Sequence, residues 1–328
     1  MTQIMELILN ADDPDAIGET LFNVVISLLA CYKAIVLRLN HNSIIMLIDT
    51  FVDKPFKPMD LRESMIRQKF DKRITNNTLC YLVLVSITAF YMISLSFFTD
   101  FMNGALMYKA WLPFDSSTSV RFSLAYAHQI LTLIFIGLVH PTCDNLICGL
   151  LLHICCQIEI LEYRLSNITN GEENLRDCVD HHVHIFEYAY TVNRRFAKII
   201  ALQFAVSMLV VCANLYKLAS IPNLMINGSI ITLILYTACM LSQIFLYCWF
   251  GNELKLKSIG LATGIYKMEW FRLDIKTKKD LLLILRRTMI PIEFNSAVIV
   301  TLNLDSFVSL FKASYSAYNV LKRSQEHN

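Results

Sequence analysis

The sequence predicts an all-α protein that crosses a membrane several times, and three observations support this fold class. Of the 328 residues, 55% are hydrophobic and only 17% are charged, against about 25% charged residues in soluble domains. The mean hydropathy is +0.48. Several uncharged apolar runs are long enough to cross a bilayer as helices, which takes about 20 residues. We therefore expect a polytopic membrane protein in contact with membrane lipid.

The composition also argues against other classes of protein. The formal net charge is only +2, and no basic run carries interleaved aromatic residues, so we expect no nucleic-acid partner. The ten cysteines form no CxxC pair and mostly lie in apolar runs, where cysteine behaves as a small hydrophobic residue. The nine glycines form no phosphate-binding loop, and no nucleophile–base pair stands out. We expect neither an enzyme nor a bound cofactor.

The first half of the chain predicts two spans joined by a polar connection. Residues 20–38 are apolar but include Lys33 and Arg38, so they form a span only if both cations reach one interface. After the basic segment 40–76, the run from Ile74 to Thr99 holds 26 residues without a charge and predicts a second span. The loop that follows contains aromatic residues and proline, which is typical of chain held at the headgroup level.

The second half predicts longer helices. One helix is expected from about Phe122 to Leu165, interrupted only by Pro141 and Asp144, and it is too long for the bilayer, so its second half should project into the cytoplasm. A polar turn at 166–180 and an amphipathic segment at 181–197 precede a span at 198–216. A break at Pro222 precedes another span near 229–250.

The distribution of Lys and Arg orients these spans. Segments 41–76, 164–198 and 255–287 together hold 21 Lys and Arg residues, whereas the loops on the opposite side hold three. Cytoplasmic loops carry the excess of basic residues, so the Trp111 and Pro222 loops should be extracellular. Asn227, in an Asn-Gly-Ser sequon on that outer side, is the expected glycosylation site.

The last apolar segment, about 298–321, is long enough to span but carries many polar residues. Polar side chains recur there at steps of three and four, which places them on one helical face: Asp305, Ser309, Lys312, Ser316, Asn319 and Arg323. A charge at the bilayer centre costs about 2.5–3.5 kcal/mol even on mild scales. This face therefore needs either water, as in a pore, or protein partners inside a bundle.

Three stretches of the second half resemble insect odorant receptors. They are Tyr-Cys-Trp-Phe-Gly-Asn-Glu at 247–253, Lys-Asp-Leu-Leu-Leu-Ile-Leu-Arg-Arg at 279–287, and Lys-Ala-Ser-Tyr-Ser-Ala-Tyr-Asn-Val-Leu at 312–321. The resemblance covers about residues 8–323. It implies a seven-helix fold of which this chain supplies six transmembrane helices, without the first. It also implies a ligand-gated cation channel in the plasma membrane of sensory-neuron dendrites.

The resemblance further implies how such a subunit assembles. Members form heterotetramers with a shared odorant receptor coreceptor, which carries a long insertion where this chain has the short turn at 166–180. The chain is thus expected to be a tuning receptor, formed as one domain over residues 1–328. The assembly region is expected on the cytoplasmic side near 150–197 and 251–293, and the pore helix at 297–321.

The expected ligand is a small volatile organic molecule, which needs an apolar, aromatic cavity with one or two hydrogen-bonding groups. Tyr91, Ser94 and Phe98 lie on one face of their span. The family's pocket lies in the outer half of spans that correspond here to 20–38, 77–98, 122–143 and 230–250. By this resemblance the pocket also includes Phe22, Ile26, Tyr126, Gln129, Ile130, Leu233, Tyr236, Thr237 and Met240. The expected pore residues are Asp305, Ser309, Lys312, Ser316 and Val320, the last as a hydrophobic gate.

Other interpretations stay open at this point. The histidines of the Asp-His-His-Val-His stretch at 180–184 could share a helical face and hold a metal, but a solvated cytoplasmic helix surface is the favoured interpretation and we expect no metal site. Alternative functions are a gustatory receptor of the same superfamily, against which the 312–321 ending argues, and a small membrane transporter.

Overall fold

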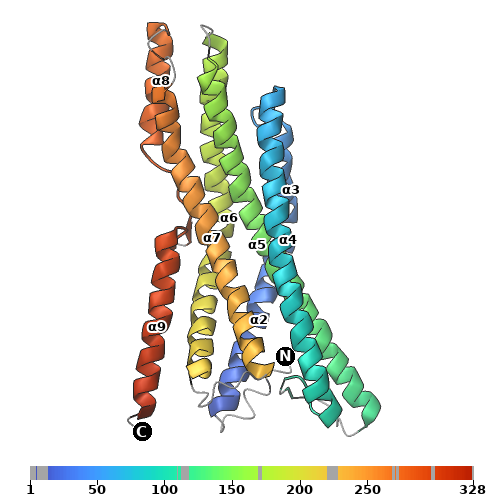
Figure 1. The fold of residues 1–328 in the computed structure, drawn as a ribbon. Coiled ribbons are helices and arrows are strands. Elements are labelled where there is room, and N and C mark those ends of the chain that lie inside the picture. Colours follow the sequence, from blue (N-terminus) through green and yellow to red (C-terminus); the bar gives the residue numbers. More distant parts are fainter. Residues whose placement is uncertain are drawn as a thin grey trace.

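The computed structural model of the chain is an elongated bundle of long helices (Figure 1). It describes Met5, residues 14–108, 110–111, 118–168, 172–219, 228–267, 270, 273–296 and 300–326. The helices are α2 (Pro14–Leu39), α3 (His41–Asp49), α4 (Leu61–Thr99), α5 (Ser119–Ser166), α6 (Glu172–Ala219), α7 (Gly228–Lys267), α8 (Ile275–Thr288) and α9 (Leu304–Glu326). Two 3₁₀ turns, η1 (Thr50–Val52) and η2 (Phe101–Asn103), and two short strands, β1 (Asn295–Ser296) and β2 (Val300–Thr301), complete the described elements.

Five of these helices, α2, α4, α5, α6 and α7, are long and apolar enough to cross a membrane. The all-α, polytopic membrane fold predicted from the sequence is thus confirmed. The sixth predicted span is also a helix, α9, of 23 residues. The end of α4, the start of α5, the end of α6, the start of α7 and the end of α9 lie together at the lower end in Figure 1. The end of α5, the start of α6 and α8 lie at the opposite end.

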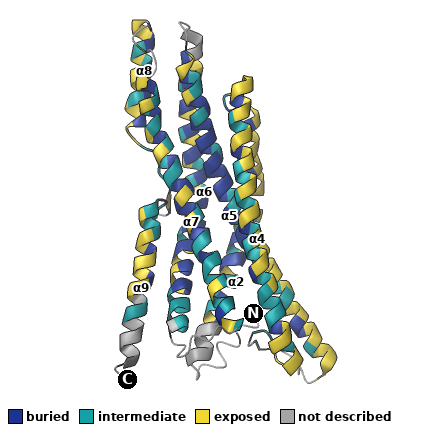
Figure 2. Cartoon of the chain, in the orientation of Figure 1, coloured by how far each residue is buried: buried dark blue, intermediate teal, exposed yellow. Residues whose placement is uncertain are grey.

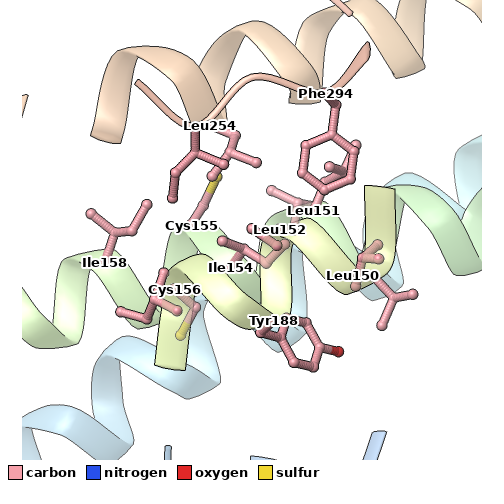
Figure 3. Close-up of a cluster of buried hydrophobic side chains, with 14 of the residues drawn as sticks. Leu150, Leu151, Leu152, Ile154, Cys155, Cys156, Ile158, Tyr188, Leu254 and Phe294 are labelled. Carbon is pink, nitrogen blue, oxygen red and sulfur yellow. The ribbon is translucent and has the colours of Figure 1, made fainter. Parts of the chain in front are cut away.

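The apolar core lies mainly in the upper half of the bundle, where buried residues concentrate on α5 and α6 (Figure 2). Leu151, Cys155, Ile160 and Leu161 on α5 are fully buried. They pack with residues of α6 and α7 and with Phe294 from the segment that precedes β1 (Figure 3). The upper parts of α5, α6 and α7 therefore form one packed body.

α5 is one helix of 48 residues that runs through Pro141, as predicted, although an internal proline removes a backbone hydrogen bond. Two helix boundaries differ from the sequence-based expectation. α6 is also a single helix of 48 residues and absorbs most of the predicted polar turn. α9 begins at Leu304 rather than 297, because Asn303 Oδ1 accepts the Ser306 N–H at 2.7 Å and caps the helix there.

The buried cation of Arg164 ties the start of α4, the end of α5 and the first part of α6 together. Its guanidinium donates to both Glu63 carboxylate oxygens, at 2.7 and 2.8 Å. It also donates to the Pro55 and Lys57 carbonyl oxygens and lies 3.1 Å from His181 Nδ1. The side chains of Arg164 and Glu63 are only 9% and 3% exposed. This ion pair is therefore a buried, fully hydrogen-bonded crosslink.

The histidines at 181–184 take part in this packing and are not the solvated surface that we expected. His181 Nε2 lies 2.9 Å from Gln157 Oε1, and His181 and His182 are buried while His184 is exposed. Among the described residues no group of three or more His, Cys, Asp or Glu side chains could hold a metal ion.

The lead into α9 rests directly on α7 at Gly251. A Cβ atom added at Gly251 would lie 2.5 Å from Leu302 Cβ and even closer to the Leu302 carbonyl oxygen. Leu302 is fixed in turn, since its N–H donates to the Phe294 carbonyl oxygen at 2.8 Å. A second contact joins the same helices, because the Phe245 and Phe307 rings lie 5.6 Å apart. The position of α9 thus depends on the absence of a side chain at Gly251 of α7.

We expect Glu63→Gln to lower the free energy of unfolding by about 3–5 kcal/mol, because it leaves Arg164 as a buried charge without its counter-ion. Asp71→Asn is the matched control: its ion pair with Arg67 is 4.0 Å long and half-exposed, and such pairs contribute about 0–1 kcal/mol. Thermal unfolding of detergent-purified protein measures both. Equal midpoints for the two variants would contradict the crosslink.

We expect Gly251→Ala and Gly260→Ala to shift stability in opposite directions. Overpacking against Leu302 costs about 1–3 kcal/mol, whereas Gly260 has nothing within 4 Å of an added Cβ, so alanine gains about 0.5–1 kcal/mol of helix propensity there. The same unfolding assay applies. A gain in stability for both variants would show that α7 and Leu302 separate without cost.

Candidate functional site

A buried ion pair lies where α2, α5 and α7 meet in the middle of the bundle. Lys33 Nζ donates to Asp144 Oδ1 at 2.6 Å, and the two side chains are 0% and 3% exposed. The Tyr247 hydroxyl donates to the same carboxylate oxygen at 2.6 Å, and Gln243 Nε2 donates to Asp144 Oδ2. Lys33 Nζ also lies 3.2 Å from His140 Nδ1. Asp144 therefore joins three helices through charge-assisted hydrogen bonds.

The polar network continues to α6. Gln203 Nε2 donates to Gln243 Oε1 at 2.7 Å and to Ser207 Oγ at 2.9 Å. All three of these side chains are buried. The network thus crosses the bundle from α2 to α6 within the membrane-length part of the helices.

An apolar cluster lies next to this network, toward the outer end of α7. Its buried members are Leu29, Val206, Val210, Val211 and Met240, and half-buried residues pack around them: Phe22, Val25, Ile26, Tyr32, Leu215, Tyr236 and Leu241. Four predicted ligand residues, Phe22, Ile26, Tyr236 and Met240, are therefore brought together from α2 and α7. The valines come from α6, a helix that sequence reasoning did not include.

Two further predicted ligand residues join α5 to neighbouring segments, Gln129 to the chain at Tyr108 and Tyr126 to α4. Gln129 Nε2 donates to the Tyr108 carbonyl oxygen at 2.9 Å, and the Tyr126 hydroxyl donates to Ser96 Oγ at 3.0 Å. Both side chains are buried. Their polar atoms are thus already engaged within the chain.

The other predicted ligand residues lie in several surroundings. The Tyr91 hydroxyl lies 3.5 Å from the Gly228 carbonyl oxygen. Thr237 Oγ1 donates to the Leu233 carbonyl oxygen and accepts from Asn214 Nδ2. Phe98 is 70% exposed and its ring contacts that of Phe97, so it lies apart from the apolar cluster. Ser94, Ile130 and Leu233 are half-buried.

The polar face predicted on the last helix is exposed on the surface of the chain. Asp305, Ser309, Lys312 and Ser316 are all exposed, whereas Leu310 and Ser314 on another face are buried. Lys312 does not point into the bundle of its own chain, so partners within that bundle do not cover this polar face. The side chain of Val320 and all of Asn227 lie outside the described residues.

A separate groove of about 580 Å³ runs along the second half of α7. Its lining contains none of the predicted ligand residues, and its cations are paired. Arg73 binds both carboxylate oxygens of Glu253, at 2.5 and 2.7 Å, and Lys257 binds Glu159 at 2.5 Å. The groove ends at Leu304, the first residue of α9.

The chain is similar in sequence to insect olfactory proteins. The family model described as 7tm Odorant receptor matches residues 13–315. Odorant receptor 46a, isoform A, of Drosophila melanogaster is 30% identical over 230 residues, which are 66% of this chain and 58% of that protein. Odorant receptor 10 of Aedes albopictus is 31% identical over 176 residues, 51% of this chain and 46% of that protein. The chain thus spans roughly half the length of these relatives.

The fold is similar to that of a solved olfactory receptor. The insect olfactory receptor OR5 from Machilis hrabei, in complex with eugenol, superposes with a TM-score of 0.87 at 18% identity. The match covers 98% of this chain and 85% of the OR5 chain. The structure of the same receptor without a named ligand gives a TM-score of 0.84. These proteins are receptors and not enzymes, and this chain belongs to the insect odorant receptor family.

Proposed function

We propose that the chain is the ligand-binding subunit of an odorant-gated cation channel whose pore is lined by α9. The observation that carries the pore assignment is the exposed polar face of α9, formed by Asp305, Ser309, Lys312 and Ser316. A helix of 23 residues is long enough to cross the bilayer. Lipid would not tolerate these charges near its centre, so the face needs water or neighbouring subunits.

The apolar cluster between α2, α6 and α7 supports the ligand site. Phe22, Ile26 and Met240 supply the aromatic and aliphatic surface that small volatile molecules need, and the Tyr236 hydroxyl supplies a hydrogen-bonding group. Met240 is unbranched and adapts its shape to its neighbours. The cluster also lies directly beside the Asp144 network, so a change in its packing bears on the helices that hold α9.

The channel is proposed to be a heterotetramer of this subunit with the odorant receptor coreceptor, in the plasma membrane of sensory-neuron dendrites. Four copies of a helix such as α9 around an axis would enclose their polar faces. The exposed apolar residues on the cytoplasmic parts of α7 and α8, including Leu256, Leu282 and Leu283, are suited to subunit contacts there.

Co-expression with the coreceptor tests the proposal. A panel of volatile compounds should evoke cation currents that neither chain gives alone. Uptake of a labelled compound by this chain without the coreceptor, together with an absence of current, would identify a transporter instead.

Phe22→Ala should raise the concentration of agonist for half-maximal current by about 5- to 150-fold, which corresponds to roughly 1–3 kcal/mol of lost apolar contact. The matched control is Phe90→Ala on α4, because Phe90 is 74% exposed and should leave the dose–response curve unchanged. Currents evoked by an agonist of the coreceptor report assembly of each variant. Identical agonist sensitivity in Phe22→Ala and the control would remove the cluster from the ligand site.

Lys312→Gln should change the single-channel conductance or the ion selectivity, because Lys312 is exposed on the proposed pore face and a cation there repels permeant cations. Lys72→Gln, at an exposed position on α4, should alter neither. Val320→Ser should raise the ligand-independent current, since a polar side chain keeps a hydrophobic constriction wet. The pore assignment fails if single-channel recordings show Lys312→Gln and Val320→Ser to be like the unsubstituted channel.

A further inference from the structure

The hydroxyl group of Tyr236 is buried and has no hydrogen-bond partner among the described residues. The ring is half-buried and packs against the apolar cluster of Leu29, Val206, Val210 and Met240. The exposed part of the side chain is therefore the ring, and the polar tip lies inside the bundle. Burying a hydroxyl without a partner costs about 1–3 kcal/mol. The Tyr236 hydroxyl therefore lowers the free energy of unfolding of the chain.

The described part of the chain offers no hydrogen-bond acceptor to the Tyr236 hydroxyl in the way that it does to other hydroxyls of α7. Thr232 and Thr237, on the same helix, turn their hydroxyls back to backbone carbonyl oxygens four residues earlier, at 3.1 and 2.8 Å. A tyrosine hydroxyl sits at the end of a rigid ring and cannot reach the backbone of its own helix in this way. Gln203 Oε1, another unpartnered buried atom, lies at the level of Gln243. That level is seven residues, or about 10 Å along α7, from Tyr236.

Three other hydroxyls around the predicted pocket are already engaged. Thr88 Oγ1 lies 3.2 Å from Cys239 Sγ, the Tyr126 hydroxyl donates to Ser96, and the Tyr91 hydroxyl lies within reach of the Gly228 carbonyl oxygen. Tyr236 thus offers a buried O–H donor without a partner among the described residues, beside the buried apolar residues of the cluster.

Resting on the function proposed above, we infer that the ligand carries an oxygen acceptor that receives the Tyr236 hydroxyl proton in a hydrogen bond. The ligand class is a small, mostly apolar molecule with one carbonyl, ester or ether oxygen. The apolar body contacts Phe22, Ile26 and Met240, and the oxygen sits at the tip of Tyr236. A hydrocarbon of the same shape gains the apolar contact but not the hydrogen bond.

Matched ligand pairs and a Tyr→Phe substitution test this assignment. Each pair consists of an ester or ketone and the hydrocarbon of the same chain length, applied to cells that express the coreceptor with this chain or with Tyr236→Phe. The ratio of half-maximal concentrations within a pair is compared between the two forms, so that differences in volatility and solubility cancel. Tyr236→Phe should reduce the preference for the oxygen-containing member by about 2- to 12-fold, the range for one neutral hydrogen bond.

Tyr188→Phe is the matched control for the loss of a phenolic hydroxyl. Its hydroxyl donates to the Leu47 carbonyl oxygen at 3.0 Å in the cytoplasmic core, far from the apolar cluster in sequence position and in the fold. It should leave the ligand ratios unchanged. The response of each form to an agonist of the coreceptor reports assembly.

The outcomes separate this inference from the proposed function. An unchanged ratio in Tyr236→Phe, with currents intact, overturns the ligand chemistry alone. A failure of Tyr236→Phe to reach the cell surface also overturns it, because deleting an unpartnered hydroxyl should not destabilise the fold. If no member of any pair evokes current in the unsubstituted subunit while the coreceptor agonist does, the proposed function fails as well.

Discussion

The structure depends on the ion pair between Lys33 and Asp144, because it places one charge of each sign inside the bundle. A buried charge that loses its partner costs about 3–5 kcal/mol. Asp144 must therefore stay within reach of α2, and it accepts from Gln243 and Tyr247 on α7 as well. Sliding any of these helices by one residue rotates its side chains by about 100° and removes a donor from the carboxylate. The ion pair thus fixes the register of α2, α5 and α7 in a region where apolar contacts alone would tolerate several alignments.

With this register fixed, α7 carries three different sets of contacts along its length. Along one helix lie Tyr236 and Met240 in the apolar cluster, then Gln243 and Tyr247 on Asp144, and then Gly251 under Leu302. The apolar cluster, the Asp144 network and the contact with Leu302 are therefore carried by successive turns of a single helix. No flexible segment of the described chain interrupts α7 between these points, which gives the proposed coupling of ligand and pore a continuous path.

The sequence predicted the long helices well, because uncharged apolar runs leave few alternatives in a membrane. The predicted long helix across Pro141 is confirmed, and His140 and Asp144 on either side of the proline are bound to Lys33 of α2. The prediction of a solvated surface at the histidines was wrong, because tertiary contacts override the local polar pattern. The polar residues after Glu172 extend α6, since His181 and His182 are covered by neighbouring helices. The Lys33–Asp144 pair could have been found, as two opposite charges stand alone in apolar segments. The contribution of the α6 valines could not have been found, since nothing in a uniformly apolar helix marks the face that meets the apolar cluster.

The place of Asp144 within its helices has a mechanical consequence. Tyr247 is the twentieth of the 40 residues of α7, and Asp144 is close to the middle of the 48 residues of α5. The two helices are thus joined near their midpoints, and from this level toward α8 they stay packed in the apolar core, which includes Cys155 and Leu254. The other half of α7, about 30 Å long, packs in the smaller apolar cluster instead. A tilt of that half against the packed half would therefore be concentrated at the level of Asp144.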